Sequence, residues 1–220
     1  MAIVTDVCLF DMDGVLIDSG AHHRKAWRAL LDELRVAPAH PEFWRLTIGR
    51  PAEEALPLLL GRRVSRAEAR RLALSKRDLY ATFAARGLEP VPGVETFVEA
   101  LARAGIPRAV GTSASRGDAE SLLGTLGLLR YFDVIVTADD VKFGKPSPEV
   151  YLEAAGRLGA PPAACVVFED SVVGIQAARR AGMRAIGVTT AHTADELRAE
   201  GAERTIADFE GLEWGSIVRR

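Results

Sequence analysis

The sequence predicts an α/β fold, with a doubly wound parallel sheet and an all-helical segment inserted after the first strand. Short apolar runs rich in β-branched residues alternate with amphipathic helical patterns over most of the chain. A glycine follows each of these helical patterns, and glycine most easily adopts the left-handed conformation at a helix end. Between residues 20 and 90 the alternation stops and only helical patterns remain.

Five apolar runs are predicted to be strands: Val4–Phe10, Arg108–Thr112, Val134–Ala138, Cys165–Phe168 and Arg184–Val188. Four helical patterns alternate with the later runs: Val94–Ala104, Arg116–Leu126, Pro148–Leu158 and Gly174–Ala181. The glycines that follow these helices are Gly105, Gly127, Gly159 and Gly182. Strands joined by helices in this way run parallel, and such sheets bind their ligands at the carboxyl ends of the strands.

The segment between residues 20 and 90 contains three helical patterns. The first spans Ala26–Leu34, the second spans Ala55–Leu60 and contains a proline, and the third begins with a capping box at Ser65. Because this insertion leaves the sheet directly after the first strand, we expect it to lie over the carboxyl edge as a lid. The predicted domains are a core of residues 1–18 and 91–220 and a cap of residues 19–90.

Composition argues against several classes of protein. The 220 residues carry a formal net charge of −2, so no overall field favours nucleic acid or an anionic membrane. No apolar run approaches the roughly 20 residues that span a bilayer, and the first residues lack the features of a secretion signal. Cys8 and Cys165 lie in apolar runs, which favours buried free thiols over a disulfide. We therefore expect a cytoplasmic protein without nucleic-acid or membrane partners, as a monomer or weak dimer.

The first predicted strand ends in two aspartates, Asp11 and Asp13, followed by Gly14. Two carboxylates this close repel each other and lose hydration near a core, so the pair needs a cation or a shared proton. This pattern supports a metal-assisted site. The alternative is a solvated Asp-x-Asp-Gly turn, in which aspartate and glycine serve the backbone conformation.

Other predicted strands also end in polar residues. The hydroxyl groups of Thr112 and Ser113 suit an anion at a helix N-terminus, or serve only to cap the next helix. Lys145 lies in a loop, where it can hold phosphate and carboxylate or be an exposed lysine. Glu169 and Asp170 are candidate metal ligands, or favourable charges at the start of a helix.

These residues share one placement, the carboxyl ends of strands in one predicted sheet. Carboxylate oxygens are ligands that Mg²⁺ accepts, and no set of histidines and cysteines suits zinc. A carboxylate nucleophile beside Mg²⁺ and a lysine fits phosphoryl transfer through an aspartyl-phosphate.

The order and content of these segments resemble the haloacid dehalogenase (HAD) superfamily, in the branch with a helical cap after the first motif. Its four motifs match Asp11–Val15, Thr112–Ser113, Lys145 and Glu169–Asp170. The resemblance covers nearly the whole chain. It implies a Rossmann-like HAD core and an enzyme that uses Mg²⁺ on a phosphorylated small molecule.

The resemblance also implies a role for each motif residue. Asp11 is then the nucleophile and Asp13 the general acid and base. Phosphate is held by the second and third motifs, that is by Thr112, Ser113 and Lys145. The metal site consists of Asp11, the backbone carbonyl of Asp13, Asp170, and Glu169 either directly or through water. Asp13 also argues against the metal-free dehalogenases of the superfamily, which need no such acid.

The predicted cap resembles that of β-phosphoglucomutases. The segment His22–Trp27 is similar to the one that follows the first motif there, and the match places His23 at the hinge. Lys76 matches a cap lysine of that subfamily. The cap arginine that binds the distal phosphate falls near Ala52, and Arg50 is a possible substitute. The alternatives are a solvated histidine in a first helical turn and a lysine on a helix surface.

The expected function is a Mg²⁺-dependent phosphatase for a small phosphorylated metabolite such as a sugar phosphate. One alternative is a β-phosphoglucomutase-like isomerase that returns the phosphate to the sugar. Another is a regulatory protein without activity on the same scaffold. That alternative predicts the loss of a core acid or of the lysine, and every one of them is present in the sequence.

Overall fold

Six parallel strands form one sheet in the computed structural model, which describes residues 6–38, 42–85 and 87–217. The strands are β1 (Val7–Phe10), β2 (Arg108–Gly111), β3 (Val134–Val136), β4 (Cys165–Glu169), β5 (Arg184–Val188) and β6 (Arg204–Ile206). Their order across the sheet is β3-β2-β1-β4-β5-β6. Because the chain winds outward in both directions from β1, the predicted doubly wound sheet is confirmed, and β1 marks its switch point.

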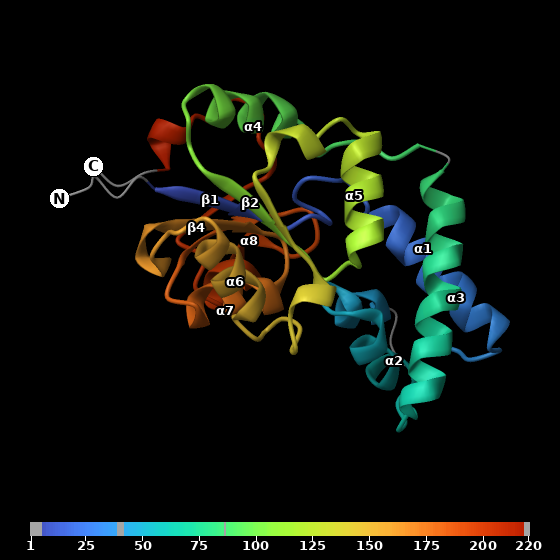
Figure 1. Cartoon of the computed structure of the whole chain (residues 1–220). Helices are drawn as coiled ribbons and strands as arrows, with labels where there is room; N and C mark the ends of the chain where they lie inside the picture. Colours follow the sequence, from blue (N-terminus) through green and yellow to red (C-terminus); the bar gives the residue numbers. More distant parts are fainter. Residues whose placement is uncertain (1–5, 39–41, 86, 218–220) are drawn as a thin grey trace.

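Helices cover both faces of the sheet (Figure 1). One face carries α4 (Val94–Arg103) and α5 (Arg116–Thr125). The other face carries α6 (Glu149–Arg157), α7 (Val172–Arg180) and α8 (Ala194–Ala199). Two separate apolar clusters fill the spaces between the sheet and these two layers.

Strand β1 is buried on both faces, as expected for the centre of a parallel sheet. Successive side chains alternate between the layers: Cys8 and Phe10 belong to one cluster, and Val7 and Leu9 to the other. Cys165 lies in the cluster opposite that of Cys8. Both thiols are buried and free, which confirms the prediction made for them.

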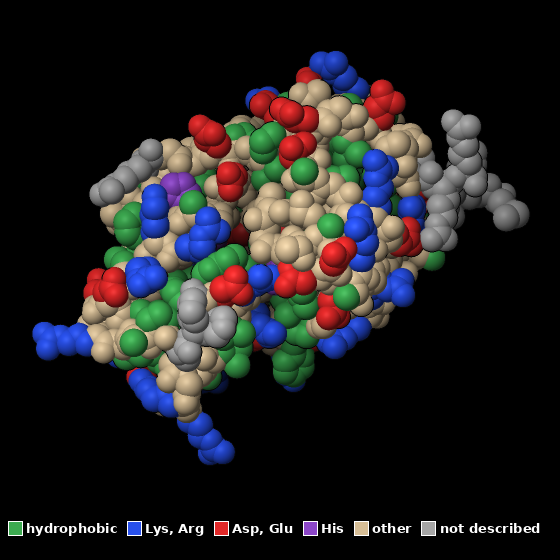
Figure 2. All heavy atoms as spheres, turned by 180° about the vertical axis from the view of Figure 1, so that it is seen from behind, with side chains coloured by type: hydrophobic (Ala, Val, Ile, Leu, Met, Phe, Trp, Pro, Cys, Tyr) green, Lys and Arg blue, Asp and Glu red, His purple; other side chains and the backbone are tan. Residues whose placement is uncertain are grey.

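The described residues between positions 20 and 84 form a group of helices beside the sheet, here called the helical insertion (Figure 1). It contains α1 (Gly20–Glu33), the 3-10 helix η1 (Phe43–Thr47), α2 (Ala52–Leu60) and α3 (Arg66–Ala84). Its apolar side chains form a third cluster of their own. Lys and Arg side chains project from this part of the surface in the view from behind (Figure 2). None of the helices in the described parts of the chain is long and apolar enough to cross a membrane.

The two chain segments that connect the insertion to the sheet are hydrogen-bonded to each other. The Asp18 amide donates to the Glu89 carbonyl at 2.9 Å, and the Val91 amide donates to the Leu16 carbonyl at 3.2 Å. The insertion therefore leaves and rejoins the sheet at one place, next to the carboxyl end of β1.

Several predicted bounds differ from the structure. Helix α1 begins at Gly20, six residues before the predicted start at Ala26. Helix α7 begins at Val172 instead of Gly174, because the Ser171 hydroxyl caps it by accepting the Gly174 amide at 3.0 Å. Strands β2 and β3 end one and two residues earlier than predicted.

The short elements β6 and α8 were not predicted. They contain three and six residues, too few for a periodic pattern to be recognised. The predicted start of the first strand, Val4, lies outside the described residues, as do the outer ends of the predicted core domain. The four glycines predicted to end helices do so, with φ between 66° and 75°.

Candidate active site

Strands β1, β2 and β4 are neighbours, and each is followed or ended by a predicted site residue. Phe10 pairs with Val110 on one side and with Phe168 on the other, so the three carboxyl ends lie at one edge. Asp11 follows β1, and Glu169 is the last residue of β4. The topology thus brings together Asp11 and Glu169, which are 158 positions apart in the sequence.

Lys145 lies at the centre of this edge and is 1% exposed. Its Nζ donates to Asp11 Oδ1 at 2.7 Å, to Glu169 Oε1 at 2.6 Å and to the Gly111 carbonyl at 3.1 Å. Burial alone would lower the pKa of the ammonium, but the carboxylates of Asp11 and Glu169 outweigh burial and raise it. The alternative of an exposed loop lysine is therefore wrong.

Glu169 is fully buried and fixed by four hydrogen bonds. Oε1 accepts from Lys145 and from the Tyr151 hydroxyl, the latter at 2.8 Å. Oε2 accepts from the Ser171 amide at 2.9 Å and from its hydroxyl at 2.8 Å. Burial would raise the pKa of Glu169, but Lys145 and these donors lower it. Glu169 is thus an ionised and rigid acceptor beneath the lysine.

Asp170 supplies the next carboxylate, and its Oδ1 is buried without a hydrogen-bond partner among the described residues. Oxygen atoms of Asp11, Glu169 and Asp170 all lie within 4.8 Å of one another. Burial and the neighbouring carboxylates raise the pKa of Asp170. Burial also raises that of Asp11, despite the Lys145 ammonium. Three acids share one ammonium here, so the group fits a divalent cation held by oxygen ligands.

The Asp13 side chain is directed elsewhere and does not belong to this group of three acids. Its Oδ1 accepts from the Ser19 hydroxyl at 2.5 Å and from Nε2 of His23 at 3.0 Å. Burial would raise the pKa of Asp13, but His23 and the two hydrogen bonds outweigh burial and lower it to about 2. Only its backbone carbonyl remains a candidate for the metal, as the family resemblance implies.

His23 connects Asp13 to Lys76 of the helical insertion. Lys76 Nζ donates to Nδ1 of His23 at 2.6 Å, and the imidazole stacks on Tyr80 with ring centroids 4.2 Å apart. Burial and the Lys76 ammonium lower the pKa of His23, which favours the neutral ring. Burial also lowers the pKa of Lys76, to about 8. A solvated histidine and a surface lysine are therefore the wrong interpretations of His23 and Lys76.

The two hydroxyl residues after β2 differ in their contacts. Thr112 Oγ1 accepts from the Ala114 amide at 3.1 Å and so shapes the loop. Ser113 Oγ donates across to the Gly49 carbonyl of the helical insertion at 3.0 Å. Gly49 has φ of 72°, and a Cβ there would lie 2.4 Å from Ser171 Oγ. The insertion thus approaches the sheet edge closely at a backbone position that suits only glycine.

A cavity of about 1000 Å³ opens between the sheet edge and the helical insertion. Every predicted site residue except Glu169 lines it, including His23, Arg50 and Lys76. Trp27 and Trp44 contribute apolar surface from the insertion side. The cavity is large enough for a molecule bigger than phosphate.

Sequence reasoning missed four residues that support the site. Thr190 and His192 follow β5: Thr190 Oγ1 donates to the Gly14 carbonyl at 2.6 Å, and His192 Nδ1 to the Asp170 carbonyl at 3.0 Å. The other two are Tyr151 and Ser171, described above. Ser171 could have been found from the sequence, because serine directly before a helical pattern is a favoured helix cap. Nothing in the local sequence marks Tyr151.

A family model of haloacid dehalogenase-like hydrolases matches residues 5–182. The chain belongs to this family. Validoxylamine A 7'-phosphate phosphatase of Streptomyces hygroscopicus subsp. limoneus is 38% identical over 218 residues, covering 96% of this chain and 97% of that protein. Fructose-1-phosphate phosphatase YqaB of Escherichia coli K12 is 38% identical over 180 residues, covering 82% and 94%.

Among solved structures, β-phosphoglucomutase of Clostridium difficile superposes with a TM-score of 0.85 at 26% identity, covering 97% of this chain and 95% of that one. This haloacid dehalogenase-like hydrolase thus belongs to the β-phosphoglucomutase-like branch and is a phosphoric monoester hydrolase. The predicted family and enzyme class are confirmed.

Proposed function

We propose that the chain is a Mg²⁺-dependent phosphatase that hydrolyses a sugar phosphate or a similar small phosphorylated metabolite through an aspartyl-phosphate on Asp11. One observation carries the proposal: Asp11 lines the cavity, is bonded to Lys145, and has a carboxylate oxygen within 4.8 Å of one of Asp170. The Oδ1 atom of Asp170 is buried and has no hydrogen-bond partner among the described residues. The relative from E. coli, named for fructose 1-phosphate, supports a sugar phosphate as the substrate class.

The residues that would hold Mg²⁺ are Asp11, Asp170 and the backbone carbonyl of Asp13, with Glu169 directly or through water. The surplus of carboxylates over ammonium groups and the free oxygen of Asp170 support this assignment. When bound, Mg²⁺ neutralises charge on the phosphoryl oxygens and makes phosphorus more electrophilic. The other oxygens are held by Lys145, and by Ser113 once its hydroxyl has released the Gly49 carbonyl. Thr112 shapes the loop that contains Ser113.

In the first step a carboxylate oxygen of Asp11 forms a bond to phosphorus as the bond to the leaving oxygen breaks. Asp13 donates its proton to that oxygen and releases an alcohol. Asp13 is ionised in the free protein, and the negative charge of an entering phosphate raises its pKa toward the protonated form. In the second step water attacks phosphorus, Asp13 takes the proton of the water, and the bond to Asp11 breaks.

We further propose that residues 1–18 and 91–220 form the core domain and residues 19–90 a cap that opens and closes. The paired connections at Asp18 and Val91 support one hinge, and the close approach of Gly49 to Ser171 at the sheet edge supports a closed state. Closure excludes bulk water and strengthens contacts to the phosphoryl group. Small-angle scattering with and without fluoroaluminate tests this proposal, because equal dimensions in both samples would contradict it.

The second candidate function is a β-phosphoglucomutase-like isomerase. It is favoured by the structural similarity to β-phosphoglucomutase and by Arg50, which lines the cavity and could reach a distal phosphate. A phosphatase needs no such contact, and both phosphatase relatives match at higher identity than this mutase. We therefore favour hydrolysis.

The deciding experiment incubates the protein with Mg²⁺ and β-glucose 1-phosphate plus a trace of the 1,6-bisphosphate. A parallel panel contains fructose 1-phosphate and other phosphorylated metabolites. We expect phosphate release to exceed isomerisation for at least one substrate. Faster formation of glucose 6-phosphate than of phosphate would identify a mutase, and no turnover in any assay would favour a regulatory protein.

A further inference from the structure

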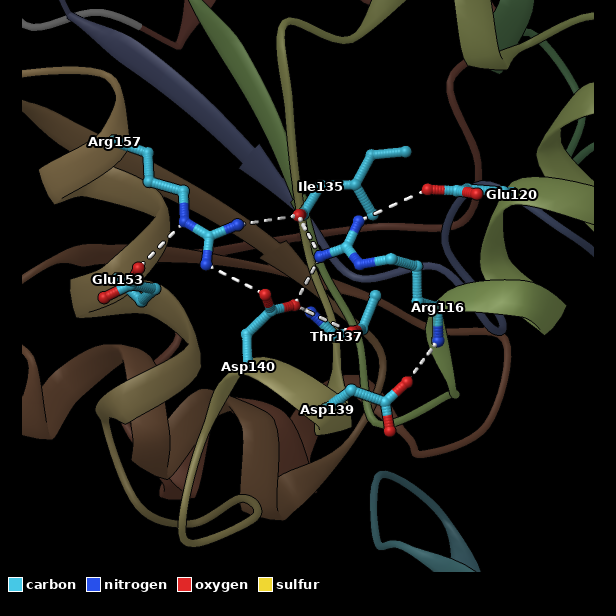
Figure 3. Close-up of polar contacts among 8 residues, drawn as sticks. All are labelled: Arg116, Glu120, Ile135, Thr137, Asp139, Asp140, Glu153 and Arg157. Atoms are coloured by element: carbon cyan, nitrogen blue, oxygen red, sulfur yellow. Dashed lines mark hydrogen bonds and ion pairs between the residues drawn. The ribbon is translucent and has the colours of Figure 1, made fainter.

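A short 3-10 helix after β3, η3 (Ala138–Asp140), joins several elements through its two acidic side chains (Figure 3). Both oxygens of Asp140 are bonded. Oδ2 accepts from the Thr137 amide and hydroxyl at 2.8 Å each, and from Arg116 Nη2 at 2.6 Å. Oδ1 accepts from Arg157 Nη2 at 2.9 Å. Arg116 is the first residue of α5 and Arg157 the last of α6. Asp140 therefore links β3 to two helices.

The same short helix holds the loop that contains Ser113. Asp139 Oδ2 accepts from the Arg116 backbone amide at 2.8 Å, at the start of α5. The Ala138 amide donates to the Ala114 carbonyl at 3.0 Å, one residue after Ser113. Moving η3 would therefore move the Ser113 loop with it.

The loop that leads to Lys145 is held from α6 at two points. Glu149, the first residue of α6, accepts the Lys142 amide at 2.8 Å and the Phe143 amide at 3.2 Å on Oε2. At the other end of α6, Arg157 bonds Asp140, five residues before Lys145. Ser113 and Lys145 thus sit on two loops that meet in one network around Asp140.

The contacts around Asp140 keep its carboxylate ionised. Asp140 has only 14% of its side chain exposed and faces two guanidinium groups. Burial would raise its pKa, but the bonds from Arg157 and Thr137 outweigh burial and lower it far below the usual range. Asp140 and the two arginines are not among the described residues that line the cavity. Their effect on a ligand is therefore indirect.

We propose that Asp140 is a positioning residue: by holding α5 and α6 against η3, it fixes the separation between the Ser113 hydroxyl and the Lys145 ammonium. The inference rests on the proposed function, in which these two groups hold the phosphoryl oxygens. A bidentate carboxylate between two arginines suits this task, because each bond is charge-assisted and directional. An amide of the same shape cannot accept from both sides, since one end of it is a donor.

The experiment compares Asp140→Asn with the wild-type chain in steady-state hydrolysis and in tungstate binding by calorimetry. Tungstate is a tetrahedral oxyanion that probes the phosphate site without turnover. We expect a fall in kcat/KM of about 10- to 100-fold, because displacements of about 1 Å cost rates of this order. The tungstate Kd should rise at least about tenfold on the same grounds.

The matched control is Glu153→Gln, since Glu153 bonds Arg157 Nε at 2.8 Å but does not touch Asp140. It should stay within about twofold of wild type, as surface substitutions usually do. If Asp140→Asn does not fold, Arg157→Ala is used instead, because Arg157 is 36% exposed and its loss spares the other three bonds of Asp140. A rise in tungstate Kd of about three- to tenfold is then expected for loss of this one charge-assisted bond.

A double-mutant cycle with Ser113→Ala separates positioning from general stability. If Asp140 acts through Ser113, Asp140→Asn costs less in the Ser113→Ala background than in the wild-type background. If Asp140 has a purely structural role, Asp140→Asn lowers the melting temperature but leaves the tungstate Kd of the folded protein unchanged. The effects of Asp140→Asn and Ser113→Ala on kcat/KM then simply multiply. Either result overturns the inference. If the wild-type protein binds tungstate but hydrolyses no phosphoester, the proposed function is refuted. The inference about Asp140 is still decided by the tungstate measurements.

Discussion

Lys76 and His23 form a contact between α3 and α1, with Nζ and Nδ1 2.6 Å apart. The other ring nitrogen of His23 is hydrogen-bonded to Asp13. One neutral imidazole therefore connects the Lys76 ammonium to the Asp13 carboxylate at the sheet edge. Lys76 Nζ also lies 5.1 Å from the centroid of the Tyr80 ring, over its face. Burial lowers the pKa of this ammonium to about 8, which brings its titration near physiological pH.

We expect kcat/KM to fall as the pH rises above about 8, because Lys76 then loses the charge that orients His23 and Asp13. The sign follows from burial, which disfavours the charged form and so shifts loss of the proton to lower pH. In Lys76→Met this alkaline limb should disappear, and activity at pH 7 should drop by roughly tenfold, because one hydrogen bond from a charged donor is lost. A pH–rate profile checks this, with the exposed Lys25→Met as control. An unchanged limb in Lys76→Met would contradict the assignment.

The two aspartates should separate kinetically. Asp11→Asn removes the proposed nucleophile, so neither turnover nor a phosphoenzyme is expected. Asp13→Asn keeps its backbone carbonyl but loses proton transfer, which should cost about 10²- to 10⁴-fold in kcat. Rapid quench with a labelled substrate measures both variants. Near-normal activity in Asp11→Asn would show that the roles are wrongly assigned.

Metal binding should be visible without activity. We expect Mg²⁺ to raise the melting temperature of the wild-type protein, because a ligand that binds only the folded state stabilises it. Asp170→Asn removes a buried carboxylate whose pKa is raised by burial and by its acidic neighbours. This variant should melt higher than wild type in EDTA and should not respond to Mg²⁺. Full wild-type turnover in excess EDTA would rule out the metal site.

Two helical glycines should respond to alanine with opposite signs. A Cβ at Gly174 in α7 would lie 1.8 Å from Glu169 Oε1. The Glu169 carboxylate cannot move aside easily, because four hydrogen bonds fix its two oxygens. Overpacking of this kind costs about 1–3 kcal/mol, more than the gain in helix propensity of up to about 1 kcal/mol. Gly156 in α6 has nothing within 4 Å of the same position.

We therefore expect Gly174→Ala to lower the free energy of unfolding and the activity. Gly156→Ala should raise the free energy of unfolding by about 0.5–1 kcal/mol and leave kinetics unchanged. Urea denaturation followed by circular dichroism measures both. Equal effects of the two substitutions would contradict the packing described for Glu169.

The sequence was sufficient for the alternation of strands and helices and for the residues at the strand ends, because both depend on short-range patterns. It was not sufficient for β6, which is three residues long and gains its place from pairing with β5. For Lys76 the sequence leaves a cap site and a surface lysine open, because a helical pattern cannot distinguish solvent from a polar cavity. The Arg116–Asp140–Arg157 network joins residues 17 and 24 positions apart, and only the packed fold brings them together.

Arg116 and Arg157, which bind Asp140, also contact the edge strand of the sheet. Strand β3 is the outermost strand on its side, and the Ile135 carbonyl accepts from Arg116 at 3.2 Å and from Arg157 at 3.4 Å. A strand from another chain would have to displace two charged side chains before it could pair there. Such guarding of an exposed strand discourages edge-to-edge aggregation. The arginines that bind Asp140 therefore also hinder neighbouring molecules from extending the sheet at β3.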